Sequence, residues 1–196
     1  MTNIAIFVSG SGTNAENIIS YFKGSKKVKV KILLSNKSDA FALERARRNG
    51  VPSLVFSSKE LRESSLVEDA LENCDVDIII LAGFLLLLPK KMIDKYRGRI
   101  INIHPALLPA YGGKGMYGEN VHKAIVAAGE KESGITIHHV NENFDDGSII
   151  FQAKCSLSPS ESVESLAAKI HVLEQANFPR VIEEFIDNSL YSNHKI

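Results

Sequence analysis

The sequence predicts an α/β fold: a single domain on an open, twisted sheet that is mainly parallel and ends in an antiparallel C-terminal hairpin. Short β-branched runs alternate with helical patterns through the first half of the chain, as in a series of βαβ units. The run Ile78–Ala82 is apolar without alternation, which is typical of a central strand covered on both faces. Two strand-like runs that follow each other closely near the C-terminus predict the hairpin.

Composition and charge predict a globular domain with no general attraction to nucleic acid or membranes. The chain has 196 residues, 44% hydrophobic and 23% charged, which suits one domain spanning residues 1–196. Lys plus Arg and Asp plus Glu both number 23, so no net field attracts nucleic acid or an anionic membrane. We expect no leader and no membrane-spanning stretch, and Cys74 and Cys155 belong to no CxxC or clustered His/Cys motif. We expect a cytoplasmic protein, monomeric or homodimeric, that acts on small molecules without a metal.

The parallel part of the sheet is expected to contain five strands separated by helices. These strands are expected at Asn3–Ser9, Val28–Ser35, Ser53–Phe56, Asp77–Ala82 and Ile100–His104. The helical patterns between them lie at Asn14–Phe22, Ala40–Asn49, Lys59–Asn73 and Lys90–Tyr96.

The pattern changes after Pro109. A glycine-rich loop is followed by a predicted helix at Glu119–Ala128, and the hairpin strands, Ile135–Val140 and Ile149–Ser156, flank a turn at Asn143–Gly147. The last helix is expected at Ser160–Ile186, where Pro179 should kink it or split it in two.

A glycine turn follows the first strand and opens the first helix, so the predicted architecture is Rossmann-like. Backbone N–H groups at such a helix start form a phosphate site. Gly10, Gly12 and Ala15 fit a dinucleotide pattern, but the second strand ends at Asn36 without the acidic residue that would bind a ribose. A phosphate monoester is therefore favoured over a dinucleotide. The alternative is a turn that only connects strand to helix.

Asn102 and His104 lie two residues apart at the end of a buried strand, so both side chains point the same way while Ile101 and Ile103 face the core. Ligands bind at the carboxyl ends of strands in open α/β sheets. Asn102 can donate a hydrogen bond to a developing oxyanion, and His104 can carry a proton. A hydrogen-bonded structural histidine is the alternative interpretation.

Asp145 is the third candidate, because a loop that folds back over the sheet would pair it with His104 and favour the imidazolium. Asp145 and Asp146 followed by glycine also make a good turn sequence, and that interpretation stays open.

Six segments, in order along the chain, carry a resemblance to a known family: Ser9–Asn14, Ser35–Lys37, Leu81–Phe84, Asn102–Pro109, Gly134–His138 and Phe144–Ile150. Together they resemble the folate-dependent formyltransferases. The resemblance implies that N10-formyltetrahydrofolate, as cosubstrate, gives its formyl group to the glycinamide amine of 5'-phosphoribosylglycinamide in de novo purine biosynthesis. It implies no metal.

The resemblance also assigns catalytic and substrate-binding residues. Asn102 and His104 correspond to the residues that hold and protonate the tetrahedral intermediate, and Asp145 to the residue that raises the pKa of that histidine. The substrate's phosphate and ribose would be bound by Gly12, Thr13, Asn14 and Glu174.

For the folate, the resemblance implies a site formed by Arg62, Leu85, Leu86, Leu87, Leu88 and Asn102. His138 matches a histidine that supports the reaction centre, and His139 should face the opposite way.

Two features depart from the family pattern. The segment Leu85–Leu88 lacks a polar or basic residue often present there, although backbone contacts to the pterin would survive. The loop Gly112–Gly118 is several residues longer than in many relatives, so Met116 and Tyr117 receive no role. Its glycines make it a candidate lid.

Three other functions compete with transfer to this amine. A formyltetrahydrofolate hydrolase keeps the same Asn, His and Asp, but usually has an additional N-terminal domain, whereas this chain begins with the first strand. A methionyl-tRNA formyltransferase would carry a C-terminal module beyond Ile196. A non-catalytic sugar-phosphate binding module would use the glycine turn and need neither Asn102 nor Asp145.

Overall fold

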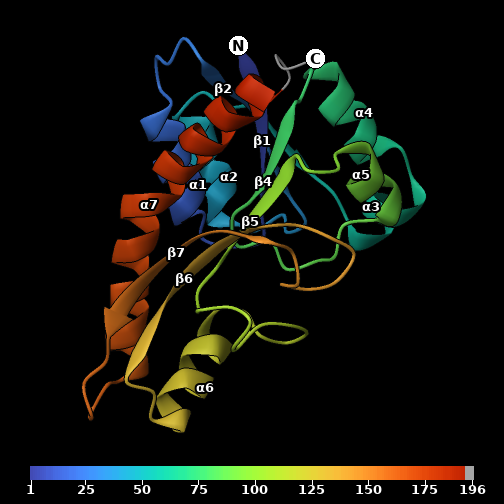
Figure 1. Cartoon of the computed structure of the whole chain (residues 1–196). Helices are drawn as coiled ribbons and strands as arrows, with labels where there is room; N and C mark the ends of the chain where they lie inside the picture. Colours follow the sequence, from blue (N-terminus) through green and yellow to red (C-terminus); the bar gives the residue numbers. More distant parts are fainter. Residues whose placement is uncertain (193–196) are drawn as a thin grey trace.

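The computed structural model describes residues 1–192, with side chains through residue 188. One sheet of seven strands has the order β3-β2-β1-β4-β5-β6-β7 (Figure 1). Its strands are β1 (Thr2–Val8), β2 (Val28–Ser35), β3 (Ser53–Val55), β4 (Ile78–Leu81), β5 (Ile100–His104), β6 (Glu132–His139) and β7 (Ile149–Ser156). The helices are α1 (Thr13–Tyr21), α2 (Phe41–Arg48), α3 (Ser58–Glu63), α4 (Leu66–Asn73), α5 (Lys90–Lys95), α6 (Glu119–Ala128) and α7 (Val163–Ser192).

The sheet is mainly parallel. Strands β1 to β5 pair in parallel, and β6 is antiparallel to both β5 and β7. The predicted α/β fold with a C-terminal antiparallel hairpin is therefore confirmed. From β1 the chain builds outward through β2 and β3, then returns to the other side of β1 with β4. This reversal of strand order opens a crevice at the carboxyl ends of β1 and β4, where open α/β sheets bind ligands.

Alternation along the strands divides the core into two layers. On β1, Ile4 and Ile6 pack with α1, α2, α6 and α7, whereas Ala5 and Phe7 pack with α3, α4 and α5 on the other face. Figure 1 shows α1, α2 and α7 on one side of the sheet and α3, α4 and α5 on the other. Every residue of β4 is buried, as predicted for a strand covered on both faces.

The prediction of one helix over Lys59–Asn73 is wrong, because two helices, α3 and α4, occupy this stretch. Ser64 takes an extended conformation between them, and its hydroxyl donates to the carbonyl oxygen of Glu60 at 2.8 Å. The next residue, Ser65, is the N-cap of α4, which begins at Leu66. The backbone N–H of Leu66 donates to the hydroxyl of Ser64 at 3.3 Å, so the side chain of Ser64 competes for backbone hydrogen bonds where α3 ends and α4 begins.

Helix α7 continues through Pro179, so the predicted split does not occur. Proline has no N–H to donate, which leaves the carbonyl oxygen of Gln175 without its helical partner. The side-chain amide of Asn17 on α1 donates to that oxygen at 2.9 Å. Figure 1 shows α7 as a single ribbon that bends along its length. Among residues 1–192, no helix is long and apolar enough to cross a membrane.

Candidate active site

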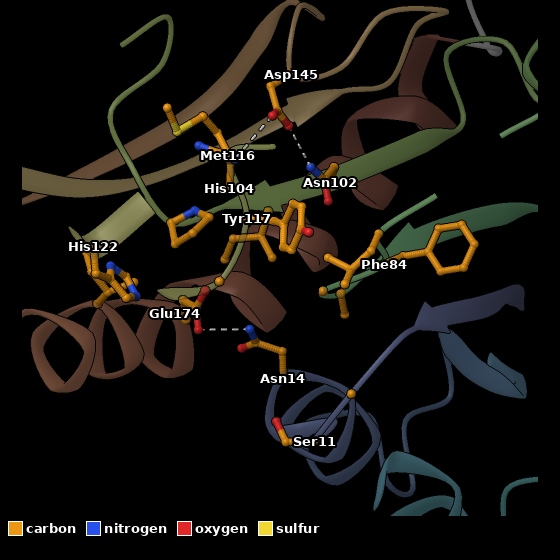
Figure 2. Close-up of a pocket in the computed structure, with 18 of the residues that line it drawn as sticks. Ser11, Asn14, Phe84, Asn102, His104, Met116, Tyr117, His122, Asp145 and Glu174 are labelled. Carbon is orange, nitrogen blue, oxygen red and sulfur yellow. Dashed lines mark hydrogen bonds and ion pairs between the residues drawn. The ribbon is translucent and has the colours of Figure 1, made fainter. Parts of the chain in front are cut away.

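A cavity of about 680 Å³ lies at the carboxyl ends of β1, β4 and β5. The parts of the chain that surround it are the glycine turn before α1, the segment after β4, the end of β5 with the loop to α6, the loop after β6, and the inner faces of α6 and α7. Figure 2 shows residues from these parts pointing toward one another across the cavity.

The glycine turn forms one end of the cavity. Gly12 has a left-handed backbone (φ 74°), and no side chain caps the start of α1. A Cβ at Gly12 would lie 2.4 Å from the Cβ of Ala42, so only glycine fits. Arg45 braces the turn from α2, because its Nε donates to the carbonyl oxygen of Ser11 at 3.0 Å and its guanidinium pairs with Glu16. The uncapped helix start is thus held open for an anion.

Glu174 on α7 lies beside this turn. The Nδ2 atom of Asn14 donates to its Oε2 at 3.0 Å (Figure 2). Burial raises the pKa of Glu174 to about 7, and the hydrogen bond from Asn14 opposes this shift only in part. The carboxyl group can therefore either accept or donate hydrogen bonds near neutral pH, which suits the hydroxyl groups of a sugar.

Asn102, His104 and Asp145 converge at the centre of the cavity (Figure 2). Asp145 lies in the loop after β6 with φ 54°, and its carboxylate is only 11% exposed. Its Oδ2 lies 3.5 Å from Nδ1 of His104, and its Oδ1 lies 3.5 Å from Nδ2 of Asn102. The structure thus brings Asp145 together with Asn102 and His104, which lie in a different segment of the sequence.

Hydrogen bonds define how the imidazoles are oriented. The Nε2 atom of His104 lies 2.8 Å from the carbonyl oxygen of Tyr111, so Nε2 carries a hydrogen and Nδ1 faces Asp145. In His138, Nδ1 faces the carbonyl oxygen of His139 at 2.8 Å, and Nε2 lies 3.1 Å from Nδ2 of Asn102. His138 is therefore a neighbour that fixes the amide of Asn102.

In the resting site, Asp145 is an anion and the imidazole of His104 is mostly neutral. Burial lowers the pKa of His104; Asp145 and the carbonyl of Tyr111 partly offset this, and His138 adds to it. Burial alone would raise the pKa of Asp145, but the bond to His138, the charge on His104 and the N–H of Gly113 together hold it below its usual value. Asp145 favours the imidazolium as expected, although burial outweighs that effect.

The sequence model of the formyl transferase family matches residues 2–182. The chain belongs to the formyl transferase family. The family that the sequence resembles is thereby confirmed, and the segments from which it was inferred line the cavity or support it.

This formyl transferase is similar in sequence and structure to several phosphoribosylglycinamide formyltransferases. It is 37% identical over 195 residues to the phosphoribosylglycinamide formyltransferase of Haemophilus influenzae, with 97% of this chain and 90% of that protein covered. It is 39% identical to the chloroplastic phosphoribosylglycinamide formyltransferase of Vigna unguiculata, with 95% of this chain and 62% of that longer protein covered. The crystal structure of phosphoribosylglycinamide formyltransferase from Anaplasma phagocytophilum superposes with a TM-score of 0.87 at 32% identity, covering 95% and 88% of the two chains.

The remaining residues predicted for the formyl transferase site lie at different places. Gly12, Thr13 and Leu85 line the cavity. Leu88 is buried in the core and Leu86 packs against it, whereas Leu87 is 42% exposed. Arg62 is exposed on α3. None of these four residues lines the cavity. His139 faces the other side of the sheet, as expected, and contacts Phe185 of α7.

Sequence reasoning did not select several other residues that line the cavity, namely Lys114, Met116, Tyr117, His122 and His171. His122 is buried on α6, and its Nδ1 has no hydrogen-bond partner among the described atoms. Its one sequence signal is its position on the inward face of a helix beside Val121 and Ile125. Over residues 1–192, no three His, Cys, Asp or Glu side chains are grouped to hold a metal ion.

Proposed function

We propose that this formyl transferase transfers the formyl group of N10-formyltetrahydrofolate to the glycinamide amine of 5'-phosphoribosylglycinamide, in purine biosynthesis. One observation carries the proposal: Asn102, His104 and Asp145 meet in the same cavity as an uncapped glycine turn. A reaction centre and a phosphate site on one surface suit a substrate that has an amine at one end and a phosphate at the other. The names of the relatives support the same assignment.

In the proposed reaction, the amine nitrogen attacks the formyl carbon, which gives a negative oxygen and a positive nitrogen. Asn102 donates to that oxygen; its contact with Asp145 is long at 3.5 Å, so the substrate oxygen can replace it. His104 moves the proton from the attacking nitrogen to N10 of the folate. The C–N10 bond then breaks, and the products are the formylated amine and tetrahydrofolate.

Asp145 stabilises the charged form of His104 at the moment when the proton is on the imidazole. No covalent intermediate is needed, because the amine is itself the nucleophile. The phosphate of the substrate occupies the glycine turn, where Thr13 and Asn14 supply donors, and Glu174 binds the ribose hydroxyls. The folate enters past Leu85, with its pterin against the segment after β4, and Arg62 meets its tail.

A two-substrate assay tests this function. Purified protein is given N10-formyltetrahydrofolate with and without phosphoribosylglycinamide, and the release of tetrahydrofolate is followed by absorbance. Release that requires phosphoribosylglycinamide and yields its formylated product supports transfer. Equal release without it would mean a hydrolase, and no release in either case would mean a binding module.

A further inference from the structure

The glycine-rich loop between β5 and α6 brings side chains into the cavity that no part of the reaction described above uses. Lys114, Met116 and Tyr117 all line the cavity. Figure 2 shows Tyr117 in the space between Asn102 and Asn14, which lie at the reaction centre and at the glycine turn. This loop therefore passes close to both ends of the space that the phosphorylated substrate would fill.

Among the described residues, neither the glycine turn nor the inner face of α7 brings a lysine or arginine to the phosphate end of the cavity. His171 on α7 lines the cavity there, with its Nδ1 3.9 Å from Oε2 of Glu174. The donors at this end are the uncapped N–H groups at the start of α1 and the polar side chains of Thr13 and Asn14.

Arg45 lies near this end of the cavity, but its guanidinium is bound to the carbonyl oxygen of Ser11 and to Glu16. A phosphate monoester carries close to two negative charges at neutral pH, so N–H groups alone leave much of that charge uncompensated.

Lys114 is the one lysine or arginine among the described residues that line the cavity. No hydrogen bond or ion pair links its side chain to any residue from 1 to 188. Gly113 (φ 96°) and Gly115 (φ 89°) flank it, and the N–H of Gly113 donates to Oδ2 of Asp145 at 3.0 Å, which holds this part of the loop beside the reaction centre. The position of the ammonium therefore depends on the long, flexible lysine side chain itself. The ammonium is thus available to a ligand.

We propose that Lys114 binds the phosphate group of the substrate and makes the enzyme specific for the phosphorylated form. This inference rests on the proposed function. In the proposed complex, the fixed N–H donors of the glycine turn contact the phosphate, and the lysine side chain reaches it from the loop through the cavity that both line. Lysine suits this role because its ammonium is a compact charge on a long, flexible stem.

The test compares two substrates and two lysines. We expect Lys114→Met to lower kcat/KM for phosphoribosylglycinamide by about 10- to 100-fold, the range for a hydrogen bond between charged groups. The same change should leave kcat/KM for the dephosphorylated ribosylglycinamide unaltered. Lys131→Met is the matched control, since Lys131 is exposed and lies outside the cavity lining. Lys114→Arg should restore part of the loss.

Each other outcome overturns the inference. An equal loss with both glycinamide substrates would mean that the lysine supports the loop, and a raised KM for the folate alone would mean that it binds folate carboxylates. If the wild type transfers no formyl group, the proposed function fails, and binding of inorganic phosphate then decides the role of Lys114. Phosphate should bind Lys114→Met at least about 10-fold more weakly than wild type and Lys131→Met; equal binding would remove Lys114 from the site.

Discussion

His104 lies between two acceptors, the carbonyl oxygen of Tyr111 and the carboxylate of Asp145, so both ring nitrogens have a partner when the ring is charged. Burial nevertheless lowers its pKa, which keeps the resting imidazole mostly neutral near pH 7. A proton that arrives during the reaction meets an anion already in place. The site therefore stabilises a charge that exists only for part of the reaction cycle, as transition-state stabilisation requires.

We predict that Asp145→Asn lowers kcat by about 10²- to 10⁴-fold, the usual range for a lost acid–base contribution. Asparagine keeps the size of the side chain and an oxygen for the N–H of Gly113, but it loses the charge that faces His104. His104→Ala should have an effect in the same range. Steady-state kinetics check the loss, and thermal unfolding checks that each variant is folded.

Two further results would follow from the same geometry. The pKa of His104 should fall further in Asp145→Asn, because the carboxylate is the larger of the two effects that oppose its lowering by burial, and the pH profile of kcat/KM would report this. Affinity for each substrate should change much less than kcat. Turnover at the wild-type rate in either variant would remove these residues from the reaction.

At the scale of elements, the glycine turn between β1 and α1 requires a backbone that only glycine adopts without strain. We predict that Gly12→Ala destabilises the protein by about 1–3 kcal/mol, because it combines a positive φ with a close approach to Ala42. It should also weaken binding of phosphoribosylglycinamide more than binding of the folate. Chemical denaturation and the two KM values measure these effects.

Gly10→Ala is the matched control for stability, since a Cβ at Gly10 meets no atom within 4 Å. It should change the free energy of unfolding by less than about 0.5 kcal/mol, as is usual at open positions. Equal losses in the two variants would mean that strain at Gly12 is not the cause.

Helices α1 and α7 are joined by the amide of Asn17, which donates to the carbonyl oxygen that Pro179 leaves free. We predict that Asn17→Ala costs about 1–3 kcal/mol of stability, because the carbonyl oxygen of Gln175 loses its partner. In a Pro179→Ala background the same change should cost less, because the new N–H of residue 179 can bond to that oxygen. A double-mutant cycle by denaturation measures the coupling, and additive costs would exclude it.

Local pattern was enough to predict most elements, because short β-branched runs mark the strands and helical patterns fill the stretches between them. The predicted Val28–Ser35, Ile100–His104 and Glu119–Ala128 coincide with β2, β5 and α6. What failed locally was the break at Ser64, where backbone competition by a side chain decided the outcome. Competition of this kind depends on the geometry of the surrounding chain, which periodicity does not record.

At the scale of the whole molecule, the candidate site depends on contacts that sequence distance hides. The sequence motifs and the family resemblance were enough to predict that Asn102 and Asp145 meet in one site. Nothing in a glycine-rich loop indicates that Lys114 and Tyr117 also line that cavity. Such a loop has no periodicity, and its position follows from the elements at its two ends. Loop residues could therefore be found only in the folded structure.

Glu174 makes the stability of the folded molecule depend on pH. An ordinary glutamate loses its proton near pH 4.5, whereas burial raises the pKa of folded Glu174 to about 7. Between these values unfolding releases a proton, so the free energy of unfolding falls as the pH rises. The loss is on the order of 3 kcal/mol over this window.

Three histidines change the free energy of unfolding in the opposite direction over part of the same pH range. Burial lowers the pKa of His104, His122 and His139, so their contribution to stability is present above pH 6.5 and is lost as the pH falls. The stability of the wild type alone therefore cannot isolate Glu174. The difference between wild type and Glu174→Gln can, because the histidines cancel and glutamine does not titrate.

We predict that wild type loses stability relative to Glu174→Gln by about 3 kcal/mol between pH 4.5 and pH 7, with little further change above pH 8. Urea denaturation of both proteins at several pH values measures the difference. Glutamine can still accept the hydrogen bond from Asn14, so the comparison removes the titration and keeps the contact. A difference that rises with pH, or that stays flat through this window, would mean that folded Glu174 is ionised at low pH like an exposed carboxylate.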